Sequence, residues 1–417
     1  MLIVGGTYRE QCAYPTWDTT QGSGMRAAAA LSNTPGVRLL TAVDVDLNDD
    51  ASLVAGGTGI TDRIVIERSD TVGFSYFTPL SVPFVTGPDA TLTSPLGGED
   101  DVALVFGMLE RGPRDISARR VVLDPQRPRS RTPLDRDGIS CEELVLLVNS
   151  SEARHFGEDS DVVAAAGVLL DREGAAAVVV KRGAAGCFVA THNGTGDVTV
   201  TRVGPYPTAR VWPIGSGDTF AAAFTHAWAN DADPVQAARV GSAAAAHWCS
   251  TQSSDLPAGL LSGDIATLKE LGLHILDPAQ APKQAQVYLA GPFFTLGEVW
   301  LVELARSVLS NQGIALFSPL HDVGRGDHSV AQADIEGLNS SSAVLALLDH
   351  GDPGTVFETG YAIKADLPVV GYTFRLDAEG AKMLTGLGGE LHNDLSTAVY
   401  RAAWRALGAP GLPKGTL

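Results

Sequence analysis

The stretch DPGTVFETGYA, residues 352–362, decides the fold of the last third of this 417-residue chain. It follows the run AVLALL, residues 343–348, which is short and apolar, as expected of a strand that is covered on both faces. The Asp-Pro-Gly-Thr sequence then forms a turn, and a helix that begins near Thr355 would carry Glu358 in its first turn. A carboxylate at this place can attack a sugar carbon.

A second stretch, QVYLAGPFF at residues 286–294, repeats this arrangement. A strand runs into a Gly-Pro turn, and an amphipathic segment follows at residues 296–309. Two strand ends therefore point at one cleft, as in open parallel α/β sheets. The alternative interpretation is that the acidic residues are ordinary strand-end and N-cap residues, which Asp often is.

Together these stretches resemble the nucleoside 2-deoxyribosyltransferase family, over residues 286–407. The resemblance implies a flavodoxin-like or Rossmann-like parallel-sheet α/β domain at residues 286–417, which cleaves or transfers N-glycosidic bonds without a cofactor. Glu358 would be the nucleophile. It would attack the anomeric carbon of a nucleoside, expel the base, and leave a glycosyl-enzyme ester that water or a second base resolves.

The same resemblance assigns roles to the neighbouring polar residues. Asp334 would protonate the leaving base, Asp352 would hold sugar hydroxyls, and the Tyr288 hydroxyl would orient Glu358. The family often has a Ser-Asp pair before the strand, where this chain has the serine pair 341–342; this departure leaves the base pocket unassigned. The other residues that the resemblance places at the substrate are Gly291, Gly354 and Asn393.

Length, composition and charge limit the possible classes of protein. A chain of 417 residues is expected to form two or three domains, and 19% charged with 45% hydrophobic residues is the balance of a soluble globular protein. The net charge is −18 and the only arginine clusters are two short stretches, whereas a duplex-binding protein needs a concentrated basic face, so nucleic acid is not an expected partner. The arginines of RGPRDISARR and PQRPRSR are interpreted as a solvated surface or as a phosphate-handling edge.

The cysteines and the N-terminal sequence predict a cytoplasmic protein. The chain opens directly on MLIVGG, with no basic leader and no long apolar segment, so neither a signal peptide nor a membrane span is expected. The four cysteines show no paired spacing and are interpreted as buried thiols in a reducing compartment. They are Cys12, Cys141, Cys187 and Cys249.

The first two thirds of the chain carry a second motif, VWPIGSGDTFAAAFTHAW at residues 211–228. Glycines directly before a helix let backbone N–H groups converge on an anion, and the helix dipole adds to the attraction. Asp218, at the helix start, could take a proton from an attacking hydroxyl. Such a loop can also close an ordinary turn.

Three further stretches strengthen this interpretation. Asn149 and Glu152 follow a strand and can organise a magnesium ion and its waters. The sequence KRGAAG, residues 181–186, joins two β-rich runs, and QGSGMRAAAALSN at residues 21–33 offers a glycine pair that leads into a helix. In this order they resemble the ribokinase-like (PfkB) family of sugar and nucleoside kinases, over residues 1–276.

The resemblance implies a ribokinase-like α/β domain with a small β lid near residues 71–85, using ATP and Mg²⁺. Asp218 would be the catalytic base, and Asn149 and Glu152 would hold the metal. The residues implied to bind the nucleotide and the transferred phosphate are Gly215, Ser216, Gly217, Lys181, Gly183 and Gly186.

Two departures concern the acceptor pocket. The family usually has an acidic residue where this chain has Trp212, and an Asn that binds the sugar where this chain has Arg26. Either the acceptor is changed, to a phosphorylated compound or a nucleoside, or the kinase fold is retained for binding or assembly. Asp18 is a candidate for a hydroxyl contact, with an ordinary turn residue as the alternative.

Residues 277–285 are rich in proline and small residues and are expected to be a linker. The sequence thus predicts a bifunctional enzyme of nucleoside or nucleotide metabolism, with an N-glycosidase regulated by a nucleotide-sensing kinase-like domain as the alternative. Candidates for a phosphate contact in the C-terminal site are His321, Arg325 and His328.

A homo-oligomer is also expected. The helix at residues 394–407 carries Tyr400 and Trp404 off its apolar stripe, and a monomer would leave part of that surface in water. The resemblance adds that a neighbouring subunit completes the site, through Asn393 or His392.

Overall fold

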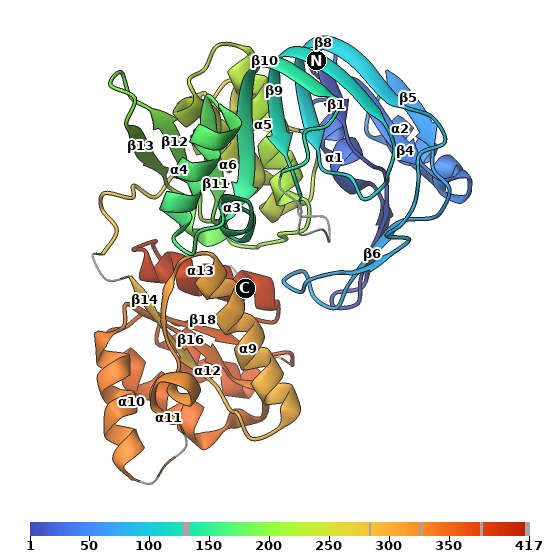
Figure 1. Ribbon diagram of the computed structural model, residues 1–417. Helices are drawn as coiled ribbons and strands as arrows, with labels where there is room; N and C mark the ends of the chain where they lie inside the picture. The colour runs from blue at the N-terminus through green and yellow to red at the C-terminus, as the bar shows by residue number, and fades with distance from the viewer. Residues whose placement is uncertain (127–133, 283–284, 325, 327, 376–377, 413–417) are drawn as a thin grey trace. The chain divides into compact units, whose positions relative to one another are not determined.

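The computed structural model describes residues 1–126, 134–282, 285–324, 326, 328–375 and 378–412, and the chain divides into two compact units (Figure 1). The first unit comprises Met1–Lys181, Gly186–Val203 and Pro213–Leu273. The second comprises Arg182–Ala185, Gly204–Trp212 and His274–Leu417. In the part of the chain that is described, no helix combines the length and apolar character needed to cross a membrane. All four cysteines are free thiols, and Cys12 and Cys187 are buried.

The first unit is built on a nine-stranded sheet in the order β13-β12-β11-β10-β9-β8-β1-β4-β5. Its strands pair in parallel from β11 to β5, and β12 and β13 are antiparallel at one edge. The strands are β1 (Leu2–Val4), β4 (Arg38–Val43), β5 (Arg63–Glu67), β8 (Leu96–Phe106), β9 (Arg114–Asp124), β10 (Ile139–Asn149), β11 (Ala177–Lys181), β12 (Cys187–His192) and β13 (Val198–Val203).

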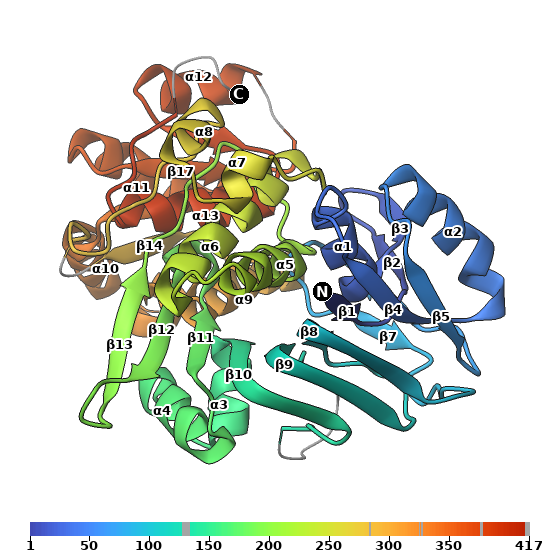
Figure 2. The ribbon, with the colours of Figure 1, turned by 90° about the horizontal axis from the view of Figure 1, so that it is seen from above.

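Helices cover both faces of this sheet, which is why the second halves of the long strands β8, β9 and β10 are mainly apolar and buried. Helices α1, α5 and α6 lie on one face, and α3 and α4 lie on the other (Figure 2). The α-helices of this unit are α1 (Gly22–Ala30), α2 (Asn48–Gly57), α3 (Ser150–Gly157), α4 (Val162–Glu173), α5 (Ser216–Ala229), α6 (Pro234–Thr251), α7 (Ala258–Leu261) and α8 (Ile265–Glu270).

A separate four-stranded sheet in the order β3-β2-β6-β7 corresponds to the predicted lid. Strands β6 (Gly73–Tyr76) and β7 (Phe84–Thr86) lie at or beside the stretch that the sequence indicated. Strands β2 (Arg9–Cys12) and β3 (Trp17–Thr20) were not predicted. Both are short and polar, REQC and WDTT, so neither shows the apolar alternation by which a strand is recognised. The unit therefore has the expected ribokinase-like architecture of a large α/β body and a small β sheet.

The second unit contains a five-stranded parallel sheet in the order β15-β14-β16-β17-β18, the flavodoxin-like order expected for this region. Helices α9 and α13 contact each other, as do α10 and α11. Its elements are β14 (Gln286–Ala290), α9 (Leu296–Asn311), β15 (Ala315–Phe317), α10 (Ser329–Ser340), β16 (Ala343–Leu347), α11 (Pro353–Lys364), β17 (Val369–Tyr372), α12 (Ala378–Gly386), β18 (Glu390–His392) and α13 (Leu395–Ala406).

Helix α11 begins two residues earlier than expected, which corrects the position of the predicted nucleophile. Asp352 is the N-cap, and its carboxylate accepts hydrogen bonds from the backbone N–H and the hydroxyl of Thr355, at 2.7 and 2.9 Å. Pro353 occupies the first helical position, where its fixed φ and missing N–H are favourable. Glu358 therefore lies in the second turn of the helix, not the first.

The surface argument for an oligomer through α13 is wrong. Trp404 is 4% exposed, and its indole N–H donates to the Ala184 carbonyl at 3.0 Å. Thr397, on the same helix, accepts a hydrogen bond from the backbone N–H of Val211. Segments Arg182–Ala185 and Gly204–Trp212 belong to this compact unit and supply these contacts, so Trp404 is buried within one chain. The oligomeric state stays a prediction without this support.

A buried ion pair connects α13 to β18. Arg401 donates from Nε and Nη2 to the two carboxylate oxygens of Glu390, each at 2.7 Å. Burial opposes ionisation of Glu390, but the hydrogen bonds from Arg401 outweigh it and lower the pKa of the carboxyl to about 2. The pair therefore contributes stability above the unfolded pKa near 4.5, and this contribution is lost as the pH falls towards 2.

Replacing Arg401 by Met is expected to lower the free energy of unfolding by about 3–5 kcal/mol at pH 7, because it leaves a buried carboxylate without its cation. Denaturant titration would measure the loss. Arg306→Met, which removes one member of a surface pair with Glu303, is the control and should change stability by less than about 1 kcal/mol. Equal effects of the two variants would contradict the assignment.

Candidate active sites

The C-terminal site is built on a hydrogen bond between β14 and α11. Tyr288 lies in β14, is fully buried, and donates from its hydroxyl to Oε1 of Glu358 at 2.7 Å. Its ring stacks on Phe317 of the neighbouring strand, with ring centroids 5.5 Å apart. The packing fixes the tyrosine ring, and the hydroxyl in turn fixes the Glu358 carboxylate. This geometry is consistent with the prediction that the Tyr288 hydroxyl orients Glu358.

The environment of Glu358 makes its carboxyl unusually basic. Burial raises its pKa to about 7, the hydrogen bond from Tyr288 acts in the opposite direction, and the charges of Asp334 and Asp352 raise it further. Burial and the Glu358 charge together raise the pKa of the Tyr288 hydroxyl, so this group stays a hydrogen-bond donor. A partly buried carboxyl that titrates near neutral pH is typical of a catalytic group.

Asp334 lies in α10, close enough for its charge to act on both Glu358 and Tyr288. Burial raises the pKa of Asp334. Its Oδ1 atom is buried and has no hydrogen-bond partner among the residues that the structure describes. Burial makes this carboxyl easier to protonate than an ordinary aspartate, and its Oδ1 atom could form a hydrogen bond with a ligand.

Cleavage at this site is expected to increase with pH as the Glu358 carboxyl ionises, with a midpoint near the pKa of about 7. Tyr288→Phe should move that midpoint to higher pH, because the hydroxyl stabilises the charged form of Glu358. The pH dependence of kcat/KM for both proteins checks this. A midpoint that stays in place or moves to lower pH in the variant would contradict the assigned hydrogen bond.

For the other predicted substrate residues of this domain, the structure gives weaker support than it does for Tyr288 and Glu358. Gly291 follows β14, and a Cβ added there would lie 3.1 Å from the side chain of Leu347 at the end of β16. Gly354 lies beside Asp352, whose Oδ2 would be 3.1 Å from an added Cβ. The Asp352 carboxylate caps α11, so its contact with sugar hydroxyls stays a prediction. Asn393 is exposed between β18 and α13.

His392 and His321, predicted to contact a neighbouring subunit's site and a phosphate respectively, contact side chains of this chain instead. His392 is 6% exposed and lies 3.4 Å from the Glu390 carboxylate, which argues against a role in a neighbouring subunit's site. His321 contacts Glu303 at 2.6 Å and the Ser318 hydroxyl at 3.0 Å. His328 is exposed, and Arg325 lies outside the described residues.

A cavity of about 760 Å³ at the carboxyl ends of β16 and β17 contains residues that the sequence did not indicate. Asp349 accepts hydrogen bonds there from the Thr373 hydroxyl and the Phe374 N–H, at 2.9 and 2.8 Å. Arg375 and His350 also line this cavity. Their position directly after strand ends could have identified them, since ligands of parallel sheets bind at that edge.

The N-terminal site is centred on the start of α5. Gly215 is the N-cap with φ of +84°, a conformation that favours glycine, and Asp218 follows in the first turn. Asp218 is 7% exposed. Its Oδ2 accepts from Nη1 of Arg26 at 2.5 Å and its Oδ1 accepts from Nε2 of Gln126 at 3.0 Å. The predicted base is therefore held by two donors.

Arg26 is the central cation of this site. It is 1% exposed, and its Nη2 donates to Glu10 while Nη1 donates to Asp218. Its guanidinium lies 5.4 Å from the centre of the Trp248 ring. Burial opposes its charge, but the two carboxylates outweigh burial and raise the pKa of Arg26. Arg26 thus places a permanent charge where the resembled family usually has a sugar-binding asparagine.

Lys181 and Asp124 form a second ion pair in the same unit. Lys181 Nζ lies 2.5 Å from Asp124 Oδ2, and 3.6 Å from the place of a Cβ added to Gly217. Burial raises the pKa of Asp124, and Lys181 opposes this effect while Glu152 adds to it. Asp124 was missed by the sequence analysis, because one aspartate at the end of the strand VVLD has no spacing pattern.

Asn149 and Glu152 form a capping box at the start of α3. The Asn149 side chain accepts from the backbone of Glu152 at 2.9 Å, and Glu152 accepts from the Asn149 N–H at 2.8 Å. The described residues contain no group of three or more His, Cys, Asp or Glu side chains arranged around a metal. The carboxylates of Asp124, Glu152 and Asp218 nevertheless interact electrostatically around one lysine. Hard oxygen donors with excess negative charge fit Mg²⁺ with retained waters.

Asp18, Trp212 and the predicted nucleotide loop at residues 181–186 lie outside the cavity beside Asp218. Asp18 forms an exposed pair with Arg9 at 2.7 Å. Trp212 is 6% exposed. The predicted nucleotide loop is divided, since Lys181 and Gly186 belong to the first unit and Gly183 to the second. An added Cβ on Gly183 would meet the Gln312 side chain at 2.7 Å.

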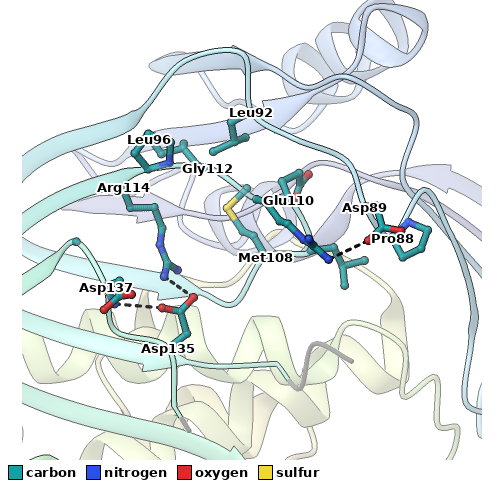
Figure 3. Close-up of a pocket in the computed structure, with 14 residues that line it drawn as sticks. Pro88, Asp89, Leu92, Leu96, Met108, Glu110, Gly112, Arg114, Asp135 and Asp137 are labelled. Carbon is teal, nitrogen blue, oxygen red and sulfur yellow. Dashed lines mark hydrogen bonds and ion pairs between the residues drawn. The ribbon is translucent and has the colours of Figure 1, made fainter. Parts of the chain in front are cut away.

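Two cavities among the described residues of the first unit are possible acceptor sites. The one beside Asp218 has a volume of about 200 Å³ and includes Tyr8, Glu10, Phe74 and Tyr76 in its lining. The other, of about 600 Å³, includes Leu96, Arg114 and Gly138 at the starts of β8, β9 and β10 (Figure 3). The lining of this larger cavity includes none of the residues predicted for the kinase site, whereas that of the smaller one includes Gly215, Gly217 and Asp218. The smaller cavity is therefore the better candidate for an acceptor.

The topology defines a ribokinase-like unit followed by a flavodoxin-like unit. Residues 121–258 match the family model of pfkB family carbohydrate kinases, and residues 287–391 match that of nucleoside 2-deoxyribosyltransferases. The chain therefore joins a PfkB carbohydrate kinase domain to a nucleoside 2-deoxyribosyltransferase domain, and both resemblances are confirmed.

Solved structures with a similar fold include two kinases of nucleosides or sugars. Adenosine kinase from Sinorhizobium meliloti is 14% identical, with a TM-score of 0.48, and the match covers 64% of this chain and 98% of that chain. Ribokinase from Thermotoga maritima is 18% identical, with a TM-score of 0.45, over 63% of this chain and 97% of that chain. No curated protein matches the chain.

Proposed function

We propose that the C-terminal domain cleaves the N-glycosidic bond of a nucleoside or nucleotide through Glu358. The observation that supports this most strongly is the 2.7 Å hydrogen bond from Tyr288 to a carboxyl whose pKa is raised to about 7. Ionised Glu358 attacks the anomeric carbon, the bond from this carbon to the base breaks, and a glycosyl ester forms. Water or a second base then resolves the ester, which gives hydrolysis or transfer.

Asp334 supplies the proton that the departing base needs. Burial raises its pKa, which makes proton donation easier, and its buried Oδ1, unpartnered among the described residues, could form a hydrogen bond with the departing base. Asp334→Asn is expected to lower kcat about 10²–10⁴-fold for substrates whose base leaves poorly, and much less for activated bases. Turnover of a series of nucleosides with graded leaving groups measures this. An equal loss for every leaving group would contradict the assignment.

We also propose that the N-terminal domain transfers a phosphoryl group from ATP to a hydroxylated acceptor. Asp218 takes the proton of the acceptor hydroxyl, and the backbone N–H groups after Gly215 face the transferred group. Asn149, Glu152 and Asp124 would hold Mg²⁺, which neutralises charge on the phosphates. The joined domains would then act on one metabolite, either a released sugar or a nucleotide made for cleavage.

The alternative is a domain that senses nucleotides and regulates cleavage without turnover. The Arg26–Asp218 ion pair favours it, because a base that is already paired is less available to an acceptor. Incubation of the full chain with Mg²⁺, ATP and a panel of pentoses, nucleosides and nucleotides separates the two. ADP formation that depends on one acceptor supports the kinase; ATP binding without consumption, together with altered cleavage, supports the sensor.

A further inference from the structure

One hydrogen-bond donor in the N-terminal site, Nε of Arg26, has no acceptor among the described residues. This nitrogen is buried, although both other guanidinium nitrogens are paired. A buried donor without a partner lowers stability by about 1–3 kcal/mol, so such an atom calls for an explanation.

The unpartnered nitrogen lies beside Gly215. A Cβ added to Gly215 would lie 2.3 Å from Nε, 2.4 Å from Cδ and 2.6 Å from Cζ of Arg26, so this part of the arginine side chain packs against the N-cap of α5. Helix α5 is 14 residues long, and its N-terminal N–H groups carry partial positive charge at the same place. The unpartnered Nε and the N–H groups at the start of α5 therefore lie in the same place, beside the predicted base.

We propose that Arg26 is a catalytic residue of the phosphoryl-transfer site and donates from Nε–H to an oxygen of the transferred phosphoryl group. This rests on the proposed kinase function. In the reaction, the acceptor oxygen bonds to the γ-phosphorus, the bond from phosphorus to the β–γ bridging oxygen breaks, ADP leaves, and the acceptor proton moves to Asp218. Arg26 contacts both parts of the site, because Nη1 donates to Asp218 and the segment that carries Nε packs against Gly215.

Glu10 is a second counter-ion of Arg26, so the arginine stays paired when Asp218 is protonated. When Asp218 takes the proton it loses its charge, and the guanidinium would then have no buried counter-ion. Glu10, which is 5% exposed and accepts from Nη2, keeps Arg26 neutralised at that stage. An arginine at the transferred group stabilises its developing charge, which is the largest effect available to such a site.

The test uses ADP with Mg²⁺ and aluminium fluoride, a planar mimic of the transferred group, so no acceptor has to be known. Calorimetry on the full chain should show that wild type binds the ADP–aluminium fluoride pair at least about 10-fold more tightly than ADP alone. Arg26→Lys and Arg26→Asn should lose most of this gain and keep ADP affinity within about threefold. Arg38→Lys, outside the site, should change neither value.

Three outcomes overturn the proposal. If both Arg26 variants keep the full gain, Nε does not contact the transferred group. If wild type binds ADP but gains nothing from aluminium fluoride, the site does not stabilise that group and the proposal fails. If wild type binds no ADP, the kinase function itself fails, and the inference fails with it.

If the variants do not fold, [¹⁵N]arginine-labelled wild type gives an independent measurement. One buried Nε–H resonance should shift on addition of the aluminium fluoride pair and not on addition of ADP alone. A spectrum in which no such resonance shifts contradicts the proposal.

Discussion

Replacing Glu358 by Gln is expected to lower kcat for glycosidic cleavage by about 10⁴-fold or more, because the amide cannot form the glycosyl ester. The same change should stabilise the protein. The folded-state pKa of Glu358 is raised from 4.5 to about 7, so wild type loses stability as the pH rises through this window. Gln removes that penalty and should gain on the order of 1–3 kcal/mol above pH 7, with no gain at pH 4.

The pair of effects distinguishes a functional carboxyl from a structural one. Gln keeps the oxygen that accepts the Tyr288 hydrogen bond, so the local geometry is retained. Glu336→Gln, an exposed carboxylate on α10, is the matched control and should change neither cleavage nor stability measurably. A Glu358→Gln protein with near wild-type turnover, or one less stable at pH 8 than wild type, would refute the assignment.

Asp218→Asn is expected to lower phosphoryl transfer about 10²–10⁴-fold while ADP affinity stays within about threefold. In the proposed mechanism the base acts on the acceptor hydroxyl, whereas backbone donors and cations hold the nucleotide phosphates. Asn keeps an oxygen that can accept from Gln126, and Arg26 keeps Glu10 as a counter-ion. Initial rates of ADP formation measure the loss of phosphoryl transfer, and calorimetry measures the ADP affinity.

Asp231→Asn provides the control for this variant. Asp231 follows the same helix, α5, is exposed, and has φ of +64°, a conformation that Asn also adopts. Its replacement should leave transfer and binding unchanged. Phosphoryl transfer that survives in Asp218→Asn would show that another group accepts the proton.

The regular parts of both domains could be predicted because their patterns are local. The apolar run before α11 and the turn at Asp352 indicated a strand and a helix, and both are present. The glycines before α5 indicated a helix N-terminus for the same reason. The start of α11 was misplaced by two residues, since the favourable effect of Pro353 at the first helical position was not considered.

The errors concern contacts between segments that are distant in the sequence. Helical spacing placed Trp404 off the apolar stripe, but it could not show that Ala184 would cover it from more than 200 positions away. The ion pairs of Arg26 with Glu10 and Asp218 likewise join three separate segments. The sequence showed that Arg26 stands where the resembled family has an asparagine, whereas only the structure showed that Nε of Arg26 has no partner among the described residues.

The most direct test of the central claim is to trap the glycosyl ester. A nucleoside with fluorine at C2 of the sugar slows breakdown of such intermediates, and mass spectrometry of the intact chain and its peptides locates the adduct. We expect one fluoropentosyl group, carried by the peptide that contains Glu358, and no adduct on Glu358→Gln. An adduct on another residue, or turnover of natural substrates by Glu358→Gln at the wild-type rate, would contradict the claim.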